Sequence, residues 1–412
     1  MRAHLPLLLL LSTTPFLHAE DWPQWFGPER NGHSAAGAAV PKALPTAIQP
    51  TWHIPVGFGL ASPIVSNGKV IYLDNQNSKE TVHLIDAATG KEVWNAILDE
   101  AFKDGQSLPG PRCTPATDGT LIFVQSCKGE LKCLNFADGK EVWHTNFTTN
   151  FGAVFIGEKG TAVGAARHGN TGSPVIDGDR LYIQPGGKDS SVACLEKKTG
   201  KVLWKSESDV PGYAPIVLAT IAGTKQAISF TADGVIGLDA DSGKLLWRVP
   251  IKTQFGRHVT TPLVVDDVVI VSSHTSGLIG TKITKDGVAF KAEPAWPPKM
   301  ESAINFSSPV AVGSNIFSLG KMKNVFCTDA KTGTQAWSKD GFGAFASFIV
   351  LDQNILVLSD KGELVLFAAD AKAFKELGRV QACATNWCHP AYANGKLFLR
   401  DAKELWCIPL VP

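Results

Sequence analysis

The chain has almost no excess of positive over negative charge. Its 39 Lys and Arg residues nearly balance 38 Asp and Glu residues, which leaves a formal net charge of +1, and no long run of one sign occurs. Proteins that hold nucleic acid or an acidic membrane surface by charge usually carry a basic face or tail. The composition therefore argues against nucleic acid as a partner.

Apolar runs long enough to cross a membrane are also missing. Residues 1–19 have the pattern of a signal peptide, with Arg2 at a positively charged start, an apolar centre from Leu7 to Leu11 and the small residue Ala19 at the end. Such a centre is too short to span a bilayer, which takes about 20 apolar residues in a helix. We therefore expect an exported protein, periplasmic or secreted, with no transmembrane segment in the mature chain.

Motifs that carry catalysis are absent as well. The sequence shows no nucleophile motif, no phosphate-binding glycine loop and no spacing of cysteine and histidine typical of zinc. The sequence therefore predicts no metal site, and it leaves catalytic residues unassigned.

What the chain has in abundance is a repeated turn. In the first copy, which runs from Asp86 to Trp94, Gly90 lies four residues before the tryptophan. Glycine at this place suits a tight turn between antiparallel strands, because it adopts a positive φ without strain. We expect the tryptophan on the following strand to dock in the interface between sheets. The docking tryptophans of the repeats are Trp94, Trp143, Trp204, Trp247 and Trp337.

A second marker leads each repeat: a small residue, then proline, then an apolar run. Eight such places are spaced by 39 to 59 residues, a period that suits four short strands per propeller blade. Proline is tolerated at the start of a strand, so we place it on the innermost strand beside the central channel. The markers begin at Ser62, Thr114, Ser173, Ala214, Thr261, Ser308, Ser347 (with Phe348 in place of proline) and His389.

Two repeats depart from the pattern. In the fifth, Lys291 stands where tryptophan is expected and Trp296 comes five residues late, and the seventh has neither the glycine nor the tryptophan. The inner strands of both repeats remain, so we interpret them as altered blades and not as missing ones.

The last repeat lacks an outer strand, and the other end of the propeller sequence can supply it. Residues 51–56 form a short strand pattern in which Trp52 would take the role of a docking tryptophan. Closing the ring in this way removes exposed sheet edges. We therefore predict an all-β, eight-bladed β-propeller of four-stranded antiparallel blades over residues 51–412. Residues 20–50 would form an arm lying on it, with Trp22 and Trp25 as packing anchors.

The Asp-x-x-Thr-Gly-Lys-x-x-Trp units resemble the PQQ-type repeat, where PQQ is pyrroloquinoline quinone. This repeat occurs in the quinoprotein alcohol dehydrogenases and in the propeller lipoprotein of outer-membrane barrel assembly. The resemblance covers residues 51–412. It is specific for the fold and weak for function, because the superfamily includes both enzymes and scaffolds.

The resemblance to the dehydrogenases implies PQQ with Ca²⁺ as cofactors, but features that accompany these cofactors are missing. Those enzymes have two adjacent cysteines that form a disulfide against the cofactor, and no two of the eight cysteines here are adjacent. Calcium takes six or more oxygen ligands, and we expect the loops that lead to the inner strands to offer no acidic residue. These absences weigh against a working PQQ dehydrogenase.

The cysteines fall into recurring positions. Four of them align ten residues before a docking tryptophan, or with that position in the last repeat, and we expect a small, buried slot there: Cys133, Cys194, Cys327 and Cys407. Cys383 and Cys388 bracket a four-residue segment and could form a local disulfide in an exported protein. Together with His389 they also form a stretched version of the haem-attachment motif, an alternative that the spacing disfavours. Cys127 has no evident partner.

Candidate binding residues lie on the loops that lead into the inner strands, around the channel mouth. Three arginines and three histidines there favour an anionic ligand, because arginine binds carboxylates through two parallel hydrogen bonds. The alternative is that these are ordinary polar groups of loops. The candidates are Arg112, Arg167, His168, Asn170, Tyr213, Arg257, His258, Asn305, Asn386, Trp387 and His389.

Two functions follow from these observations. The first is a non-catalytic binding or scaffold module of the exported compartment, with a protein, a peptide or a small anionic ligand as partner. The second is a PQQ-dependent oxidoreductase that acts on an alcohol or a sugar. The intact repeat and the missing catalytic set favour the first.

Overall fold

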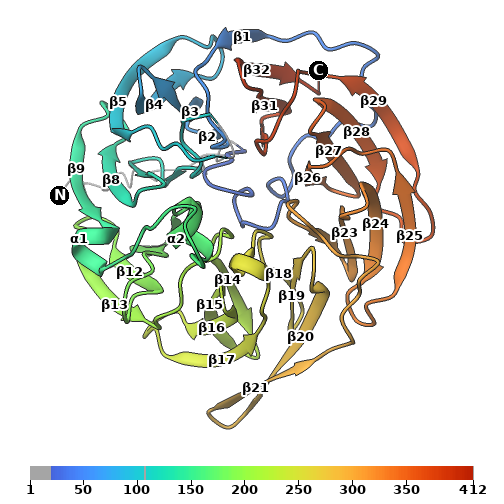
Figure 1. Ribbon diagram of the computed structural model, residues 1–412. Coiled ribbons are helices and arrows are strands. Elements are labelled where there is room, and N and C mark those ends of the chain that lie inside the picture. Colours follow the sequence, from blue (N-terminus) through green and yellow to red (C-terminus); the bar gives the residue numbers. More distant parts are fainter. Residues whose placement is uncertain (1–19, 106–107, 412) are drawn as a thin grey trace, which may run out of the picture.

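The computed structural model describes residues 20–105 and 108–411, and it arranges them as a ring of eight β-sheets (Figure 1). Within this part of the chain every sheet has four strands, and neighbouring strands are antiparallel. The prediction of an eight-bladed propeller is therefore confirmed. The signal peptide expected at residues 1–19 lies outside the described residues.

The blades follow the sequence repeats, and their strands run in chain order from the channel outward, except that β1 is the outer strand of blade eight. From blade one to blade four the strands are β2 (Ile64–Ser66), β3 (Lys69–Gln76), β4 (Lys79–Asp86) and β5 (Glu92–Glu100); β6 (Ala116–Thr117), β7 (Leu121–Gln125), β8 (Glu130–Asn135) and β9 (Glu141–Asn146); β10 (Val175–Asp177), β11 (Arg180–Ile183), β12 (Val192–Glu196) and β13 (Val202–Ser206); β14 (Val217–Ile221), β15 (Thr224–Thr231), β16 (Gly234–Asp239) and β17 (Leu245–Pro250). From blade five to blade eight they are β18 (Leu263–Val265), β19 (Val268–Ser273), β20 (Gly277–Asp286) and β21 (Ala289–Pro294); β22 (Val310–Val312), β23 (Asn315–Leu319), β24 (Asn324–Asp329) and β25 (Gln335–Asp340); β26 (Ala346–Leu351), β27 (Asn354–Ser359), β28 (Glu363–Ala368) and β29 (Glu376–Gln381); β30 (Ala391–Ala393), β31 (Lys396–Arg400), β32 (Glu404–Pro409) and β1 (Trp52–Pro55).

The inner strands are short and buried, whereas the outer strands are half exposed. In blade one, every residue of β2 is buried, but β5 alternates between exposed and partly buried positions. The β2 strand starts directly after Pro63, and β10 starts directly after Pro174. The expected place of the proline marker, at the start of the innermost strand, is therefore confirmed.

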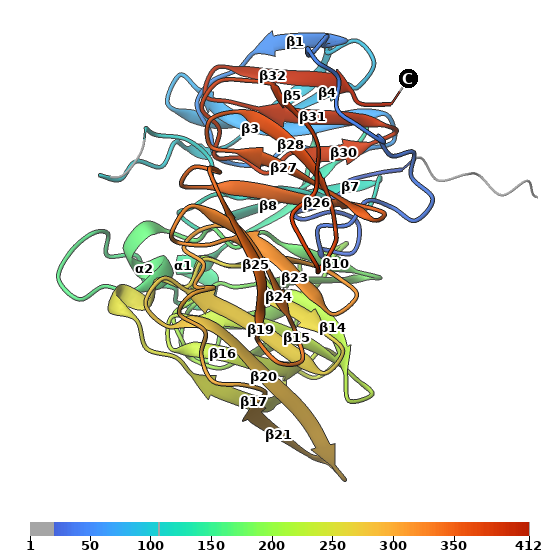
Figure 2. The same cartoon turned by 90° about the vertical axis from the view of Figure 1, so that its right-hand side faces the viewer.

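Three short helices lie in the connections between blades. The α1 helix (Phe147–Phe151) and the α2 helix (Gly164–His168) lie in the long connection between blades two and three, and the 3-10 helix η1 (Gln254–Gly256) connects blades four and five. Seen from the side, α1 and α2 project from one face of the ring, and the N-terminal arm lies on the opposite face (Figure 2).

The ring is closed where the two ends of the propeller sequence meet. β1 pairs with β32 in antiparallel fashion, with Trp52 opposite Cys407 (Figure 1). The predicted closure by the N-terminal strand is therefore confirmed, and blade eight has no unpaired outer edge left by the missing repeat strand.

The turn glycine and the docking tryptophan belong to the same contact between neighbouring blades. Trp94 of blade one donates a hydrogen bond from Nε1 to the oxygen of Phe136 in blade two, at 3.0 Å. Its indole packs against Gly139, which has a φ of +69°, and a Cβ atom added there would lie 2.6 Å from the ring. Glycine is required for the backbone angle and also for the close approach of the indole. Trp52, Trp143, Trp204, Trp296 and Trp337 also bond to backbone oxygens of the following blade.

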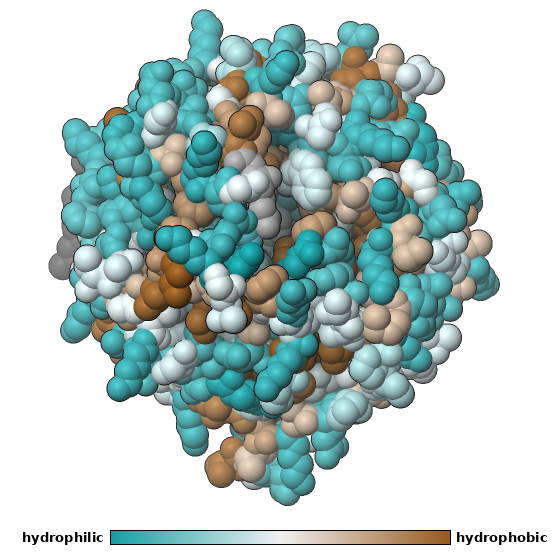
Figure 3. Space-filling view, viewed as in Figure 1, coloured by the Kyte–Doolittle hydropathy of each residue, from teal (hydrophilic) through white to brown (hydrophobic). Residues whose placement is uncertain are grey.

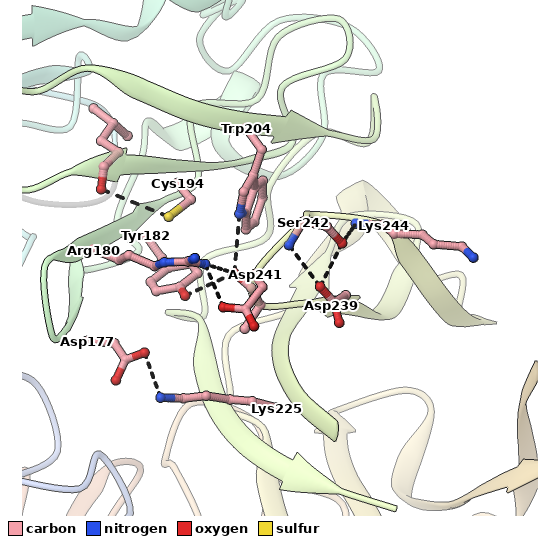
Figure 4. A network of polar contacts seen from close by, with 12 residues as sticks. Asp177, Arg180, Tyr182, Cys194, Trp204, Lys225, Asp239, Asp241, Ser242 and Lys244 are labelled. Atoms are coloured by element: carbon pink, nitrogen blue, oxygen red, sulfur yellow. Dashed lines mark hydrogen bonds and ion pairs between the residues drawn. The ribbon is translucent and has the colours of Figure 1, made fainter. Parts of the chain in front are cut away.

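The interface between blades three and four contains several hydrogen bonds around one docking tryptophan (Figure 4). The oxygen of Ala240 in the turn of blade four accepts hydrogen bonds from Trp204 at 3.2 Å, Tyr182 at 3.1 Å and Arg180 at 2.9 Å. Arg180 also pairs with Asp241 at 2.9 Å. Cys194 faces Trp204 across the sheet, in the small slot that the repeat predicted.

The slot before the docking tryptophan is confirmed in each of the four cysteine-bearing blades. The cysteine lies directly opposite the tryptophan on the neighbouring strand and is fully buried: the pairs are Cys133 with Trp143, Cys194 with Trp204, Cys327 with Trp337 and Cys407 with Trp52. A small side chain there leaves room for the indole.

Blade five changes the pattern in a way that the repeat spacing did not predict. Trp247 packs between blades four and five, but its Nε1 donates to Gln226 of its own blade at 2.6 Å, and no indole packs on Gly287 in the turn of blade five. Trp296 takes over the docking role towards blade six, with Nε1 donating to Ala330 at 3.0 Å and the indole against Gly333. The late tryptophan therefore serves as the docking residue of this blade.

Blade seven has a glycine where the docking tryptophan stands in other blades. Gly378 pairs with Leu366 just before the strand irregularity that follows the tryptophan elsewhere. Leu44 of the N-terminal arm packs on Gly378, and it joins Val40 and Ile48 against the core of blades seven and eight. The arm thus supplies the apolar contact that this blade lacks.

The first part of the arm closes one end of the central channel. We call residues 21–34 the plug. Trp22 pairs with Val65 of β2, and the guanidinium group of Arg30 donates to the oxygens of Pro174 and Ile216, each at 3.2 Å. The plug therefore holds the inner edges of blades on opposite sides of the ring.

Candidate ligand-binding site

A cavity of about 810 Å³ lies at the other end of the channel, on the face that carries α2 and η1. Figure 3 views this face and shows apolar side chains grouped around its centre, inside a rim that is mostly hydrophilic. Cys388 lines the cavity, and the next residue, His389, stacks on Trp22 of the plug with 6.0 Å between ring centroids. The plug therefore lies directly behind the cavity, and the channel is closed at that end.

The structure brings six of the eleven predicted residues to this cavity. They are Arg112, Arg167, His168, Tyr213, Arg257 and Trp387. They come from the connections leading into five different blades, so only closure of the ring brings them together. Aromatic and aliphatic side chains complete the wall: Phe58, Leu60, Leu108, Phe255, Val259 and Phe306.

Two of the arginines are held by aromatic rings and not by acids. The guanidinium carbon of Arg167 lies 4.1 Å from the ring centroid of Phe255, and that of Arg257 lies 4.6 Å from the centroid of Phe306. Among the residues that the structure describes, neither arginine forms an ion pair. A guanidinium group stacked on a ring keeps its N–H groups free to bind a carboxylate or a phosphate.

Tyr213 lies among the three arginines. Burial raises the pKa of its hydroxyl above the ordinary value, although the charges of Arg167, Arg257 and Arg112 act in the opposite direction. The hydroxyl is therefore neutral and able to donate a hydrogen bond. All four side chains line the same cavity.

Trp387 presents an aromatic surface at the rim. Its side chain is stacked on Phe345 with ring centroids 5.2 Å apart, and Phe306 meets it edge-on at 5.7 Å. It nevertheless remains 43% exposed. Large aromatic groups that stay half exposed beside a cavity are well suited to stacking on a ligand.

Two acidic residues and one histidine form a cluster at the wall of the cavity near Arg112. The sequence did not predict this cluster. His168 Nδ1 lies 3.1 Å from Asp104 Oδ2 and 3.5 Å from Glu158 Oε1, and Arg112 Nη1 lies 2.8 Å from the same Asp104 oxygen. The ligand atoms of Asp104, Glu158 and His168 lie within 4.8 Å of one another, close enough to hold a metal ion. Arg112 already neutralises one of the two carboxylates, which favours an ion-pair network. The expectation that these loops carry no acidic residue is wrong, because Asp104 lies in the connection that leads to β6 and Glu158 lies in the one that leads to β10.

The other five predicted residues lie away from the cavity surface. His258 is fully buried and stacks on Phe230, with ring centroids 4.1 Å apart, and burial lowers the pKa of its imidazole. His389 is buried between the plug and β26, and burial lowers the pKa of its imidazole to about 4. Both histidines therefore contribute to packing inside the ring and not to the mouth.

The three asparagines do not line the cavity either. Asn386 holds the backbone of Cys388, accepting its N–H at 3.0 Å and donating to its oxygen at 2.9 Å. Asn170 contributes its backbone oxygen, which accepts a hydrogen bond from the thiol of Cys113 at 3.0 Å. Asn305 has a buried side-chain oxygen that finds no partner within the described part of the chain.

The structure holds Cys383 and Cys388 as buried, unbonded cysteines, like the six others, so the possible disulfide between them stays a prediction. The Cys383 thiol points to the oxygen of Ala384 at 3.3 Å, whereas the Cys388 thiol points to the oxygen of Gly59 at 3.6 Å. The turn made by Asn386 fixes the backbone of Cys388.

Fold and site together define an eight-bladed propeller with a cavity at one end of its channel and a plug from its own N-terminal arm at the other. A family model described as "Outer membrane protein assembly factor BamB" matches residues 78–303 and 297–375. The chain belongs to this family of PQQ-like repeat propellers.

BamB proteins and quinohemoprotein alcohol dehydrogenases are both found as relatives, at low sequence identity. The BamB protein of Shewanella oneidensis is 22% identical over 397 residues, 89% of this chain and 91% of that protein. That of Burkholderia pseudomallei is 26% identical over 310 residues, 71% of this chain and 69% of that protein. The quinohemoprotein alcohol dehydrogenase of Comamonas testosteroni is 29% identical, but only over 161 residues, 37% of this chain and 20% of that protein.

Solved structures agree on the fold. The Comamonas testosteroni alcohol dehydrogenase superposes with a TM-score of 0.66 at 13% identity, covering 95% of this chain and 80% of that one. BamB from Moraxella catarrhalis superposes with a TM-score of 0.55 at 14% identity, covering 88% of this chain and 98% of that one. In the described part of this chain, none of the helices has the length and apolar character needed to cross a membrane.

Proposed function

We propose that this protein is a binding propeller of the exported compartment, whose cavity holds an anionic group attached to a flat apolar one. The observation that carries the proposal is the pair Arg167 and Arg257, stacked on rings beside the neutral hydroxyl of Tyr213. Guanidinium groups recognise carboxylates and phosphates, and the aromatic wall recognises the flat apolar part.

A protein partner suits the surroundings of the cavity. The connection between α1 and α2, on the same face, exposes three consecutive apolar side chains, Val154, Phe155 and Ile156. Phe155 rests edge-on against Phe102, with centroids 5.5 Å apart. Neighbouring exposed apolar groups beside a charged cavity are typical of an interaction surface. The names of the matched relatives, assembly factors for outer membrane proteins, agree with a protein partner. An acidic segment containing an aromatic residue would satisfy the cavity and this surface together.

An exported location follows from the signal-peptide pattern of residues 1–19 and agrees with those names. Fusion of residues 1–30 to a reporter that is active only after export tests the location directly. Export of the reporter supports the proposal, and retention of the reporter in the cytoplasm rejects it.

The second candidate, a PQQ-dependent oxidoreductase, fits the cavity only in part. The arginines and Trp387 suit a planar tricarboxylate, which PQQ is. The calcium that accompanies PQQ needs six or more oxygen ligands. Asp401 lines the cavity, but its side chain already accepts the backbone N–H groups of Ala384, Lys403 and Glu404. Asp104 pairs with Arg112. The described residues therefore do not fit the calcium-dependent chemistry.

Binding measurements with three probes separate these functions. We would titrate the purified protein with benzene-1,3,5-tricarboxylate, with an acidic peptide containing phenylalanine, and with PQQ plus Ca²⁺, and follow heat release and thermal stability. The variants Arg167→Gln and Arg257→Gln should each weaken binding about tenfold or more, because a hydrogen bond to a charged group contributes about 1.5–3 kcal/mol. Arg379→Gln, on the outer strand of blade seven, is the matched control and should bind as the wild type does.

The outcomes are distinct. Binding of the peptide or the tricarboxylate that depends on both arginines supports the proposal. Alcohol-dependent dye reduction with bound PQQ would favour the enzyme. Equal affinity of both arginine variants and the wild type would reject the cavity as the site.

A further inference from the structure

Two cysteines of blade two lie side by side, although the sequence offered no partner for Cys127. Cys113 precedes β6 and Cys127 follows β7. These strands pair with Ala116 opposite Phe123, so continuing the register by three residues places Cys113 opposite Ser126, next to Cys127. The two cysteines form a small buried cluster of their own with Phe102.

Shared hydrogen bonds fix the two residues against the same segment. The Cys113 thiol donates to the oxygen of Asn170 at 3.0 Å, and the N–H of Asn170 donates to the oxygen of Cys127 at 2.8 Å. Contact with the Cys113 thiol, together with burial, raises the pKa of the Cys127 thiol. The sulfur atoms are therefore neighbours inside the fold.

The other six cysteines in the described part of the chain have different surroundings. Four face a docking tryptophan in the slot of their blade. Cys383 and Cys388 point to different backbone oxygens. Cys113 and Cys127 are therefore the pair that we expect to form a disulfide within this fold.

We propose that Cys113 and Cys127 are joined by a disulfide in the exported protein, which staples the inner strand of blade two to the turn after β7. The two thiols lose two protons and two electrons, and one bond forms between the sulfurs. The oxidant is another disulfide, such as glutathione disulfide or a protein disulfide, which is reduced to two thiols. The proposal rests on the exported location only for the source of this oxidant.

The bond strengthens the wall of the cavity. Arg112 lines the cavity and precedes Cys113 directly, and its partner Asp104 belongs to the same ion-pair network as His168. Because both thiols are buried in the folded blade, the bond forms during folding, while oxidant still has access. The closed loop of fifteen residues, 113–127, reduces the freedom of the unfolded chain.

The trypsin sites of the sequence make the test direct. Cleavage after Arg112 and after Lys128 releases one peptide, residues 113–128, that carries both cysteines and no other cleavage site. The purified protein would be unfolded and refolded with a mixture of reduced and oxidised glutathione. Its free thiols would be alkylated in denaturant, and the digest would be analysed without reduction.

We expect peptide 113–128 to be two hydrogen atoms lighter than the reduced peptide and to carry no alkyl label, whereas the other six cysteines are alkylated. Both cysteines of this peptide carrying alkyl labels after oxidative refolding would overturn the proposal. A glutathione adduct on Cys113 in the Cys127→Ala variant would support it, because it identifies the thiol left without its partner. The refolding mixture supplies the oxidant, so the result is independent of where the protein resides and of what the cavity binds.

A second measurement needs no refolding and so still tests the proposal if the unfolded protein does not refold. The melting temperature of wild-type protein purified from an oxidising compartment should fall by about 3–6 °C when a reductant is added. The variant with Cys113→Ala and Cys127→Ala should melt at the same temperature with and without reductant. Cys327→Ala, in the slot of blade six, is the control and should keep the wild-type response. A wild-type melting temperature that does not respond to reductant would contradict the proposal.

Discussion

The two ends of the channel use the same residue types for different purposes. At the plug end, Trp22 is 1% exposed, and Arg30 donates to backbone oxygens of blades three and four. At the cavity end, Trp387 is 43% exposed, and Arg167 rests on an aromatic ring. Where a side chain is buried and bonded within the chain, the residue serves stability. Where it leaves hydrogen-bonding groups and aromatic faces open, the residue is available to a ligand.

Replacing one tryptophan at each end should give the largest contrast. Trp22→Ala removes a fully buried indole that packs against β2 and His389, and we expect a loss of about 3–5 kcal/mol in the free energy of unfolding. Trp387→Ala should cost about 1 kcal/mol or less, because its side chain is half exposed. Urea unfolding followed by circular dichroism measures both changes. A loss for Trp22→Ala as small as that expected for Trp387→Ala would show that the plug adds little to the stability of the ring.

Replacing one arginine at each end sharpens the same contrast. Arg30→Gln leaves the oxygens of Pro174 and Ile216 buried without their donor, so we expect a loss of about 2–4 kcal/mol in the free energy of unfolding. Arg167→Gln should change that free energy by about 1 kcal/mol or less, since it removes one stacking contact, while ligand binding is weakened. The same urea experiment decides, and an Arg167→Gln variant as unstable as Arg30→Gln would assign Arg167 a structural role.

The histidine behind the cavity predicts a dependence of stability on pH. Burial lowers the pKa of His389 to about 4 in the folded protein, whereas a histidine in an unfolded chain takes up its proton near pH 6.5. Between these values the unfolded state binds more protons. The contribution of His389 is therefore fully present above about pH 6.5 and is lost as the pH falls towards 4, by about 2–3 kcal/mol.

Urea unfolding from pH 4.5 to 7.5 tests this dependence. His389→Gln should be less stable than the wild type at pH 7.5 and should show a shallower fall towards pH 4.5. The fall should not disappear, because burial also lowers the pKa of His258. A profile parallel to that of the wild type would assign the acid sensitivity to other groups.

Much of the fold could be predicted because each repeat carries its own register. Gly139 and Trp94 fix one turn and one interface between blades, and the same pair recurs around the ring. The closing strand was predictable for the same reason, since Trp52 continues the pattern. The contact of Leu44 with Gly378 was not predictable, because the arm has no repeat and its partner position is known only from the folded chain.

The candidate site could be predicted only by its place along the chain. The proline marker locates the loop before each inner strand, but it does not say which way a side chain points. Arg257 and His258 are adjacent, yet the first lines the cavity and the second is fully buried. Asp104 reaches His168 from the connection of another blade, and Glu158 reaches it from within the same connection, but the spacing of these residues along the sequence carries no signal.

The smallest expected effect concerns the hydroxyl of Tyr213 at the cavity end. Burial raises its pKa above the ordinary value near 10. The hydroxyl should therefore remain a hydrogen-bond donor, and the affinity for benzene-1,3,5-tricarboxylate should stay constant between pH 8 and 10. Tyr213→Phe removes the donor and keeps the ring, so we expect binding about three- to tenfold weaker, near 1 kcal/mol, at unchanged stability. Calorimetric titration at pH 8 and pH 10 measures both effects. Wild-type binding that weakens towards pH 10 while that of Tyr213→Phe stays constant would mean that the hydroxyl ionises, and that the cavity is wetter than its burial indicates.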